Sequence, residues 1–286
     1  PPLIHLDREA VAAGHNDRLG LRLQIEPLFS RYLSTGGYLT ALNDEAIYGA
    51  VRAETFQTYR EAIIGEFTRA KFREPYLREV VNWIAGHLGQ EFDSRGIAAD
   101  TDIGSKDTAR NYVDHLAATY VVDIAYRTNS LTNTSPAFRA PKKLHPTDPL
   151  VFHLIRAWAD SDPDPWPMAA STLQRPSEAG HLVESTVAVH LRRAIGERVY
   201  YWRVSDGAEI DCVIAPPGQP ITLAEVKYRR RVDPGDLTEI LGQGGGLVLT
   251  RDEAGLFANG RVYALPVAEF LACLNAPARG PARQSG

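Results

Sequence analysis

Acidic and basic side chains alternate with apolar ones on two strand-like segments, "AEIDCVI" and "ITLAEVKY", which a Pro/Gly-rich turn joins. Successive side chains of a strand point to opposite faces. Glu209 and Asp211 therefore share one face of the first segment with Val213, and Glu225 and Lys227 share one face of the second. If the two strands pair in an ordinary register, Asp211, Glu225 and Lys227 meet at one polar spot.

This combination of groups suits metal-assisted phosphodiester hydrolysis. Neighbouring carboxylates repel each other, and burying them without a partner costs free energy. A divalent cation bound between them removes this cost. Oxygen ligands favour Mg²⁺ or Mn²⁺ over zinc, so we predict a metal site formed by Asp211, Glu225 and Glu209. The Lys227 ammonium would orient a water molecule and offset charge on a phosphoryl group. The alternative is an ion pair of Glu225 and Lys227 with Asp211 on a solvated face.

The elements around these strands predict a mixed sheet with helices on both sides. A helix is expected over 176–196, where Leu182, Val183, Val187 and Leu191 are available to pack. Further strands are expected at "RVYYWRV", "GLVLT" and "RVYAL", and further helices at 233–243 and "PVAEFLACL". His181 and Glu184, three residues apart, could form a metal pair, but a solvated helix face is favoured.

The N-terminal half is predicted to be mainly helical. Residues 1–72 form a helical subdomain with a break at Gly36-Gly37. Over 73–145, a helix, a short helix, a helix capped by Ser105 and a hairpin follow one another, an order typical of a winged helix-turn-helix. Its third helix offers Lys106, Arg110 and Asn111 to DNA but also two aspartates, so a role as a protein spacer stays open.

Charge and composition limit the function classes. The 286 residues carry a net charge of -4, so nucleic-acid binding must depend on local basic patches rather than on bulk charge. Besides the third helix, we predict nucleic-acid contacts at two such patches, although each could be a solvated face: Lys142, Lys143, Arg229 and Arg230. The two cysteines support neither a disulfide framework nor a Cys-based zinc site, and a cytoplasmic location is expected.

No apolar run reaches the length of a membrane helix, so no membrane association is expected. The sequence contains one methionine, Met168, and does not begin with it, which indicates a fragment or a processed product. A nuclease-like domain is assigned to 146–275, with a loop over 160–167 that repeated prolines impose. Residues 276–286 are predicted to be a disordered tail.

The pattern "EIDCVI" followed by "LAEVKY" resembles the PD-(D/E)XK nuclease motif, with Asp211 matching the first acidic residue and Glu225-Val226-Lys227 the Glu-x-Lys triplet. Glu184 in "HLVEST" matches the acidic residue that such folds often carry on the preceding helix. The resemblance implies that Asp211, Glu225, Lys227 and Glu184 are catalytic.

The order of segments along nearly the whole chain is similar to the C-terminal region of unknown function in AAA-type P-loop ATPases of bacteria and archaea. The segments include "FSRYLSTGGYL", "PKKLHPTDPLV" and "GHLVEST". This resemblance implies an ATPase domain preceding these segments. The chain itself has no G-x-x-x-x-G-K-[ST] loop, so no bound nucleotide is expected in it.

The sequence thus predicts an α+β or α/β fold: a helical subdomain and a winged helix-turn-helix, then a PD-(D/E)XK-like mixed sheet flanked by helices. Three functions remain open, and one of them is a pure oligomer scaffold that would show neither binding nor metal uptake. The first is a Mg²⁺- or Mn²⁺-dependent DNA endonuclease module that an ATPase domain regulates. The second is a non-catalytic module that binds DNA or a protein for an ATPase. Either could work as an oligomer.

Overall fold

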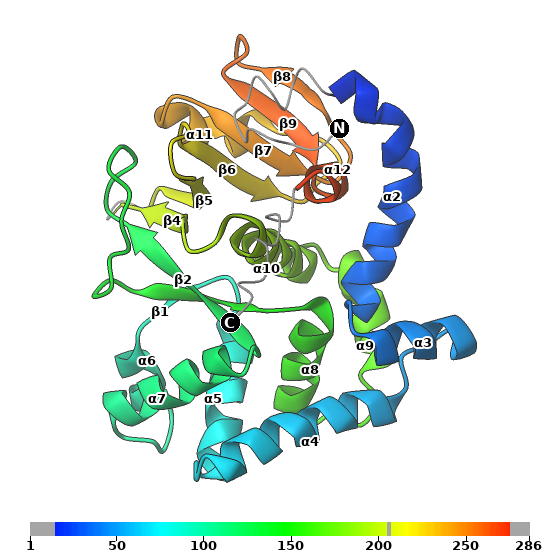
Figure 1. The fold of residues 1–286 in the computed structure, drawn as a ribbon, viewed down its shortest axis with the longest axis vertical. Coiled ribbons are helices and arrows are strands. Elements are labelled where there is room, and N and C mark those ends of the chain that lie inside the picture. The colour runs from blue at the N-terminus through cyan, green and yellow to red at the C-terminus, as the bar shows by residue number, and fades with distance from the viewer. Residues whose placement is uncertain (1–14, 205–206, 275–286) are drawn as a thin grey trace, which may run out of the picture.

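The computed structural model describes residues 15–204 and 207–274 (Figure 1). The N-terminal part contains mainly helices and three strands: α2 (His15–Thr35), α3 (Leu39–Tyr48), α4 (Ala53–Arg69), α5 (Glu74–Gly86), β1 (Glu91–Phe92), α6 (Ser94–Asp100), α7 (Lys106–Ala118), β2 (Val122–Thr128), β3 (Lys142–Pro146) and α8 (Pro149–Asp160). The C-terminal part continues with α9 (Trp166–Ser171), η1 (Thr172–Gln174), α10 (Pro176–Ile195), β4 (Val199–Arg203), β5 (Glu209–Ile214), β6 (Thr222–Lys227), η2 (Pro234–Leu237), α11 (Thr238–Gly242), β7 (Gly246–Thr250), β8 (Gly255–Phe257), β9 (Val262–Pro266) and α12 (Val267–Ala272).

Nine strands within the described ranges form one mixed sheet in the order β1-β3-β2-β4-β5-β6-β7-β9-β8. The hairpin of β2 and β3 joins the C-terminal strands by a short parallel pairing, in which Arg127 lies opposite Tyr201 and Thr128 opposite Trp202. Strands β5 and β6 pair antiparallel, and β6, β7 and β9 run parallel to one another. The predicted mixed sheet flanked by helices is confirmed.

Helix α10 lies at the centre of the molecule, between the C-terminal strands and the N-terminal helices (Figure 1). Its apolar stripe is buried as predicted and joins the main apolar core, through Leu182, Val183, Val187 and Leu191. A second apolar core, which contains Leu237 and Ile240 of η2 and α11, covers the other face of the sheet. The central C-terminal strands are therefore buried on both sides, as the apolar composition of β7 and β9 requires.

The helices over 73–118 form where the pattern of apolar residues predicts them. Helix α5 has proline in its first turn and buries Leu77, Val80, Val81 and Ile84. The Ser105 side chain caps α7 by accepting a hydrogen bond from the Thr108 N–H. The hairpin of β2 and β3 follows α7, but a winged-helix arrangement and the predicted domain boundaries stay predictions.

Several predicted features differ from the structure or lie outside the described residues. Strand β8 is missing from the sequence prediction, because three residues are too few to show an alternating pattern. The predicted loop over 160–167 ends early, since α9 begins at Trp166. The predicted tail at 276–286 lies outside the described residues. None of the helices in the described ranges combines the length and apolar character needed to cross a bilayer.

The turn between α2 and α3 depends on Gly36, and replacing it with alanine tests this packing. Gly36 has φ +72°, and an added Cβ would lie 2.7 Å from the Leu150 backbone nitrogen at the start of α8. We expect Gly36→Ala to lower the free energy of unfolding, measured by urea denaturation, by at least about 1 kcal/mol more than Gly49→Ala. Gly49 is a matched control, since it has φ +71° but open space around it. Equal losses in the two variants would show that the contact with α8 is unimportant.

Candidate metal centre

A β-bulge in β5 decides which way Asp211 points. Tyr200 lies opposite Val213 and Trp202 lies opposite Ile210, so β5 has one more residue than β4 between these pairs. The Asp211 carboxylate accepts a hydrogen bond from the Val226 N–H at 2.8 Å. The predicted strict alternation is therefore wrong here. Asp211 contacts groups on the α10 side of the sheet, whereas Val213 packs in the core on the other face.

Three carboxylates converge beside α10: Glu184 of α10 with Glu209 and Asp211 of β5. One oxygen of each lies within 4.8 Å of the other two. Burial raises the pKa of Glu184 to about 7, and the Lys143 charge opposes this shift. Among the described residues this is the group that could hold a metal ion. It contains Asp211 and Glu209 of the predicted ligand set together with Glu184, and the predicted role of Glu225 as a ligand stays a prediction.

Lys143 of β3 lies within this carboxylate cluster. Its side chain is 2% exposed, and its Nζ is 2.7 Å from Glu184 Oε1 and 3.9 Å from Asp211 Oδ1 and also contacts Glu209. Burial acts to lower the pKa of Lys143, but the three carboxylate charges outweigh it and hold the pKa well above its ordinary value. The prediction that Lys143 is a surface residue for DNA was wrong, because alternation along β3 turns it toward α10.

Glu225 and Lys227 contact each other next to the cluster. Glu225 is 1% exposed, its Oε2 lies 3.1 Å from Lys227 Nζ, and it hydrogen-bonds with Asp211. Its other oxygen, Oε1, has no hydrogen-bond partner among the described residues. Burial, reinforced by the charge of Asp211, raises the pKa of Glu225 to about 9. Asp211 and Glu225 thus lie together as the strand register predicts, and Asp211 links the pair to the cluster.

The raised pKa of Glu225 predicts an unusual pH dependence of stability. In the unfolded chain this carboxyl ionises near 4.5, whereas in the folded protein it stays protonated up to about 9. The folded state therefore binds more protons between these values, and the free energy of unfolding falls as pH rises. Between pH 7.5 and 8.5 we expect the metal-free protein to lose about 1 kcal/mol.

Glu225→Gln should remove this loss, because glutamine mimics the protonated carboxyl. Urea denaturation at the two pH values measures the difference. The same slope in both proteins would show that Glu225 is already ionised at pH 7.5.

The remaining residues proposed to contact nucleic acid lie on two surfaces. Lys106, Arg110 and Lys142 line one pocket between α7 and β3, and Asn111 is exposed on α7. Arg229 pairs with Asp233 and Asp236 at 3.4 and 3.2 Å, and Arg230 lies 3.8 Å from Asp252. Nearby carboxylates therefore offset the positive charges of both arginines. The surface of α7 and β3 is the better candidate for contacts with nucleic acid. His181 is half-buried against Gly89 and is not part of the carboxylate cluster.

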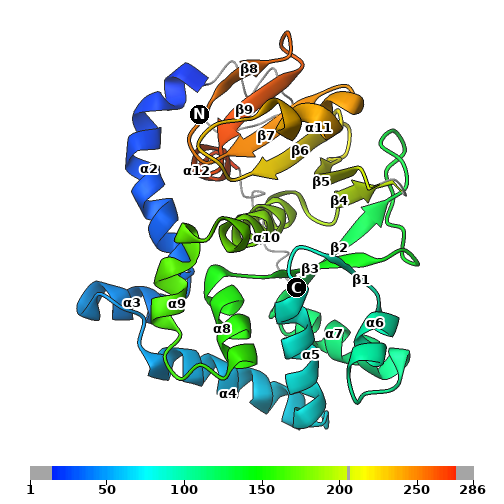
Figure 2. The ribbon, with the colours of Figure 1, turned by 180° about the vertical axis from the view of Figure 1, so that it is seen from behind.

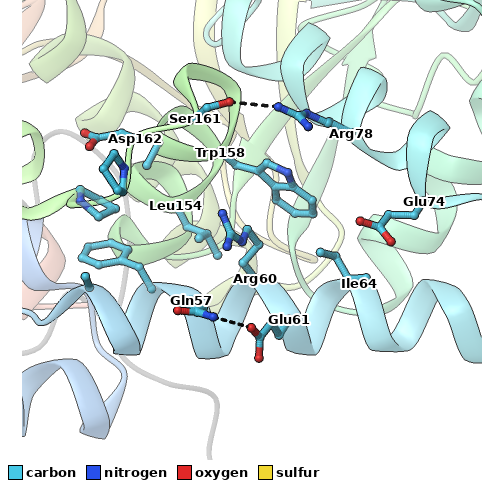
Figure 3. A pocket seen from close by; sticks show the side chains of 15 residues that line it. Gln57, Arg60, Glu61, Ile64, Glu74, Arg78, Leu154, Trp158, Ser161 and Asp162 are labelled. Carbon is cyan, nitrogen blue, oxygen red and sulfur yellow. Dashed lines mark hydrogen bonds between the residues drawn. The ribbon is translucent and has the colours of Figure 1, made fainter.

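Another pocket, of about 520 Å³, lies away from the cluster between α4, α5 and the end of α8 (Figure 3). Trp158, Leu154 and Ile64 contribute apolar surface, and Arg60 and Arg78 contribute charge. Arg78 donates a hydrogen bond to Ser161, and Gln57 donates one to Glu61. None of the residues predicted to be functional lines this pocket, so its size alone assigns it no role.

Two family models match different parts of the chain. Residues 179–270 match the family model of a domain of unknown function, DUF4143. This domain is found at the C-terminus of proteins associated with AAA-type ATPases, in agreement with the order of segments in the sequence. Residues 26–161 match a second domain of unknown function, DUF8612. No curated protein and no solved structure matches the chain.

The DUF4143 match contains every carboxylate of the cluster, whereas Lys143 belongs to the DUF8612 match. The cluster is therefore assembled from two separately matched regions. Sequence reasoning missed this arrangement because no short pattern links β3 to α10. Lys143 also stands beside Lys142, and two adjacent lysines resemble an exposed patch.

The chemistry of the cluster fits a divalent cation. Glu184, Glu209, Asp211 and Glu225 supply four carboxyl groups against the two ammonium groups of Lys143 and Lys227, so two negative charges remain when all are ionised. The donors are oxygens, as Mg²⁺ and Mn²⁺ prefer. Lys143 offsets part of the negative charge of the carboxylates. The raised pKa values of Glu184 and Glu225 favour their protonated forms, which lowers the negative charge further.

Proposed function

We propose that this chain is a metal-dependent module that hydrolyses phosphodiester bonds of nucleic acid and works with an AAA-type ATPase. The observation that carries the proposal is the convergence of Glu184, Glu209 and Asp211 beside Glu225 and Lys227, which contact each other. A PD-(D/E)XK nuclease-like arrangement agrees with this set of residues. An ATPase domain preceding these segments and a cytoplasmic location remain part of the proposal.

The residues have distinct roles in this proposal. Glu184, Glu209 and Asp211 would hold Mg²⁺ or Mn²⁺, which supplies Lewis-acid activation of water and charge stabilisation at the phosphoryl group. Lys227, with a side chain 31% exposed, can donate hydrogen bonds to an incoming water or a phosphate oxygen. Glu225 holds Lys227 in place at 3.1 Å. Lys143 is too buried to reach a substrate, so it balances the charge of the carboxylates.

The position of Lys143 favours a second candidate function, a binding module without catalysis. An ammonium group that contacts Glu184 and Glu209 competes with a metal ion for the same oxygens. A chain that keeps Lys143 there permanently would bind nucleic acid or a protein partner for the ATPase and cut nothing. The two candidates therefore differ in whether a divalent cation enters the cluster.

Cleavage of a labelled nucleic acid tests the proposal. The purified chain is incubated with single-stranded and duplex oligonucleotides in Mn²⁺, in Mg²⁺ and in excess chelator. The nuclease proposal expects products with new ends that form in the presence of metal and not with chelator. Nucleic-acid binding without metal-dependent products would favour the binding module.

A further inference from the structure

A basic groove lies on the face of the β2–β3 hairpin opposite the carboxylate cluster. Its volume is about 570 Å³, and residues of α6, α7 and the two strands line it. Figure 2 shows α6 and α7 next to the strands of the hairpin. Lys142 faces this groove while its neighbour Lys143 faces the cluster. Strand β3 therefore separates the groove from the cluster.

The charge of the groove is positive. Lys106, Arg139 and Lys142 line it, and none of them forms an ion pair within the described part of the chain. Arg110 also lines the groove and lies 3.9 Å from Asp107, with more than half of its side chain exposed. Asp114 is an acidic group at the same place, and Asp93 and Arg95, which pair with each other at 2.9 Å, also line the groove. The basic groups outnumber the acidic ones, which favours an anionic ligand.

An exposed aromatic ring stands among these charges. Phe138 is 66% exposed, and its ring packs edge-on against Tyr126 with centroids 5.3 Å apart. The Lys142 ammonium lies 5.8 Å from the centre of the Tyr126 ring. Aromatic rings flanked by cations bind single-stranded nucleic acid, since bases stack on the rings while the cations contact the phosphates.

We propose that this groove binds single-stranded nucleic acid, with one unpaired base stacked on Phe138 and phosphates at Lys106, Arg139 and Lys142. The inference rests on the proposed nucleic-acid function and names the form of its ligand. Reading of a duplex needs the helix to project into a major groove about 12 Å wide. Here Lys106 and Arg110 of α7 instead line a groove shared with β3. Stacking on Phe138 also needs a base whose face is free of its neighbours.

Fluorescence anisotropy tests the groove without depending on cleavage. A labelled 12-nucleotide oligothymidine and a duplex of equal length are titrated with the full chain in chelator. We expect tighter binding of the single strand, and about tenfold weaker binding in Phe138→Ala, while Phe138→Trp keeps the affinity. Lys106→Ala and Arg139→Ala should each lower the slope of log affinity against log salt by about 0.7.

Tyr120→Ala is the control, because Tyr120 is 78% exposed but is not among the residues that line the groove. Equal or tighter binding of the duplex, or unchanged affinity in Phe138→Ala, would overturn the inference. Metal-dependent cleavage alongside either result would leave the proposed function standing. Single-strand binding that depends on Phe138, without any cleavage, would instead sink the nuclease proposal and support the groove.

Discussion

Lys143→Met should lower the free energy of unfolding at neutral pH by about 3–5 kcal/mol, because it leaves buried carboxylates without their cation. Lys143 is 2% exposed and contacts Glu184 and Glu209. Methionine retains most of the apolar stem, so the loss reports chiefly on the charge. Urea denaturation in chelator measures it. Added Mn²⁺ should restore more stability to the variant than to the wild-type protein, since the cation then meets no competitor.

Lys142→Met provides the matched control. Lys142 is the preceding residue of β3 and lies on the opposite face, half-buried, with no carboxylate contact in the described part of the chain. We expect it to change the unfolding free energy by less than about 1 kcal/mol. Similar losses in the two variants would show that the ion pairs of Lys143 contribute no special stability. Absence of Mn²⁺ rescue in Lys143→Met would indicate that the carboxylates do not accept a metal ion.

Asp211→Asn should reduce metal-dependent cleavage by at least about 100-fold. Removal of groups that merely orient metal ligands already costs 10–100-fold, so removal of a ligand charge should cost more. Asparagine can still accept the hydrogen bond from the Val226 N–H, which Asp211 accepts at 2.8 Å, so β5 and β6 should stay joined. Initial rates on the labelled oligonucleotides measure the effect.

Glu239→Gln removes one carboxylate charge from an exposed position on α11 and should leave the rate unchanged. Circular dichroism of both variants checks that the fold is retained. Cleavage in Asp211→Asn at more than half the wild-type rate would exclude Asp211 from the reaction. The activity would then have to arise elsewhere in the chain or from a contaminant.

Helices were predictable because their apolar stripes are local. The Leu, Val, Ile and Ala residues whose spacing indicates a helix are buried in α5, α7 and α10, although α10 also buries Ser185 and Thr186. The strands β5 and β6 were predictable because charged and apolar residues alternate within a few positions of each sequence, although the bulge in β5 breaks the alternation of faces after Asp211. The convergence of Asp211 with Glu225 followed from this alternation and from the short turn between the strands.

The bulge and the position of Lys143 were not predictable from local pattern. A single additional residue in β5 turns Asp211 toward α10 and brings Glu184 into the carboxylate cluster. Lys143 reaches the cluster only because β3 follows β2 into a sheet whose next strand, β4, comes more than 50 residues later. Such pairing depends on the whole sheet, and no short motif records it.

Calorimetric titration of Mn²⁺ into the metal-free protein tests the central claim most directly. It is performed on the wild-type chain and on the double variant Glu184→Gln, Asp211→Asn, which removes two of the three converging carboxylate charges. The account predicts about one Mn²⁺ per chain for the wild type and loss of that binding in the double variant. No binding by the wild type, or equal binding by both proteins, would contradict a metal centre at this cluster.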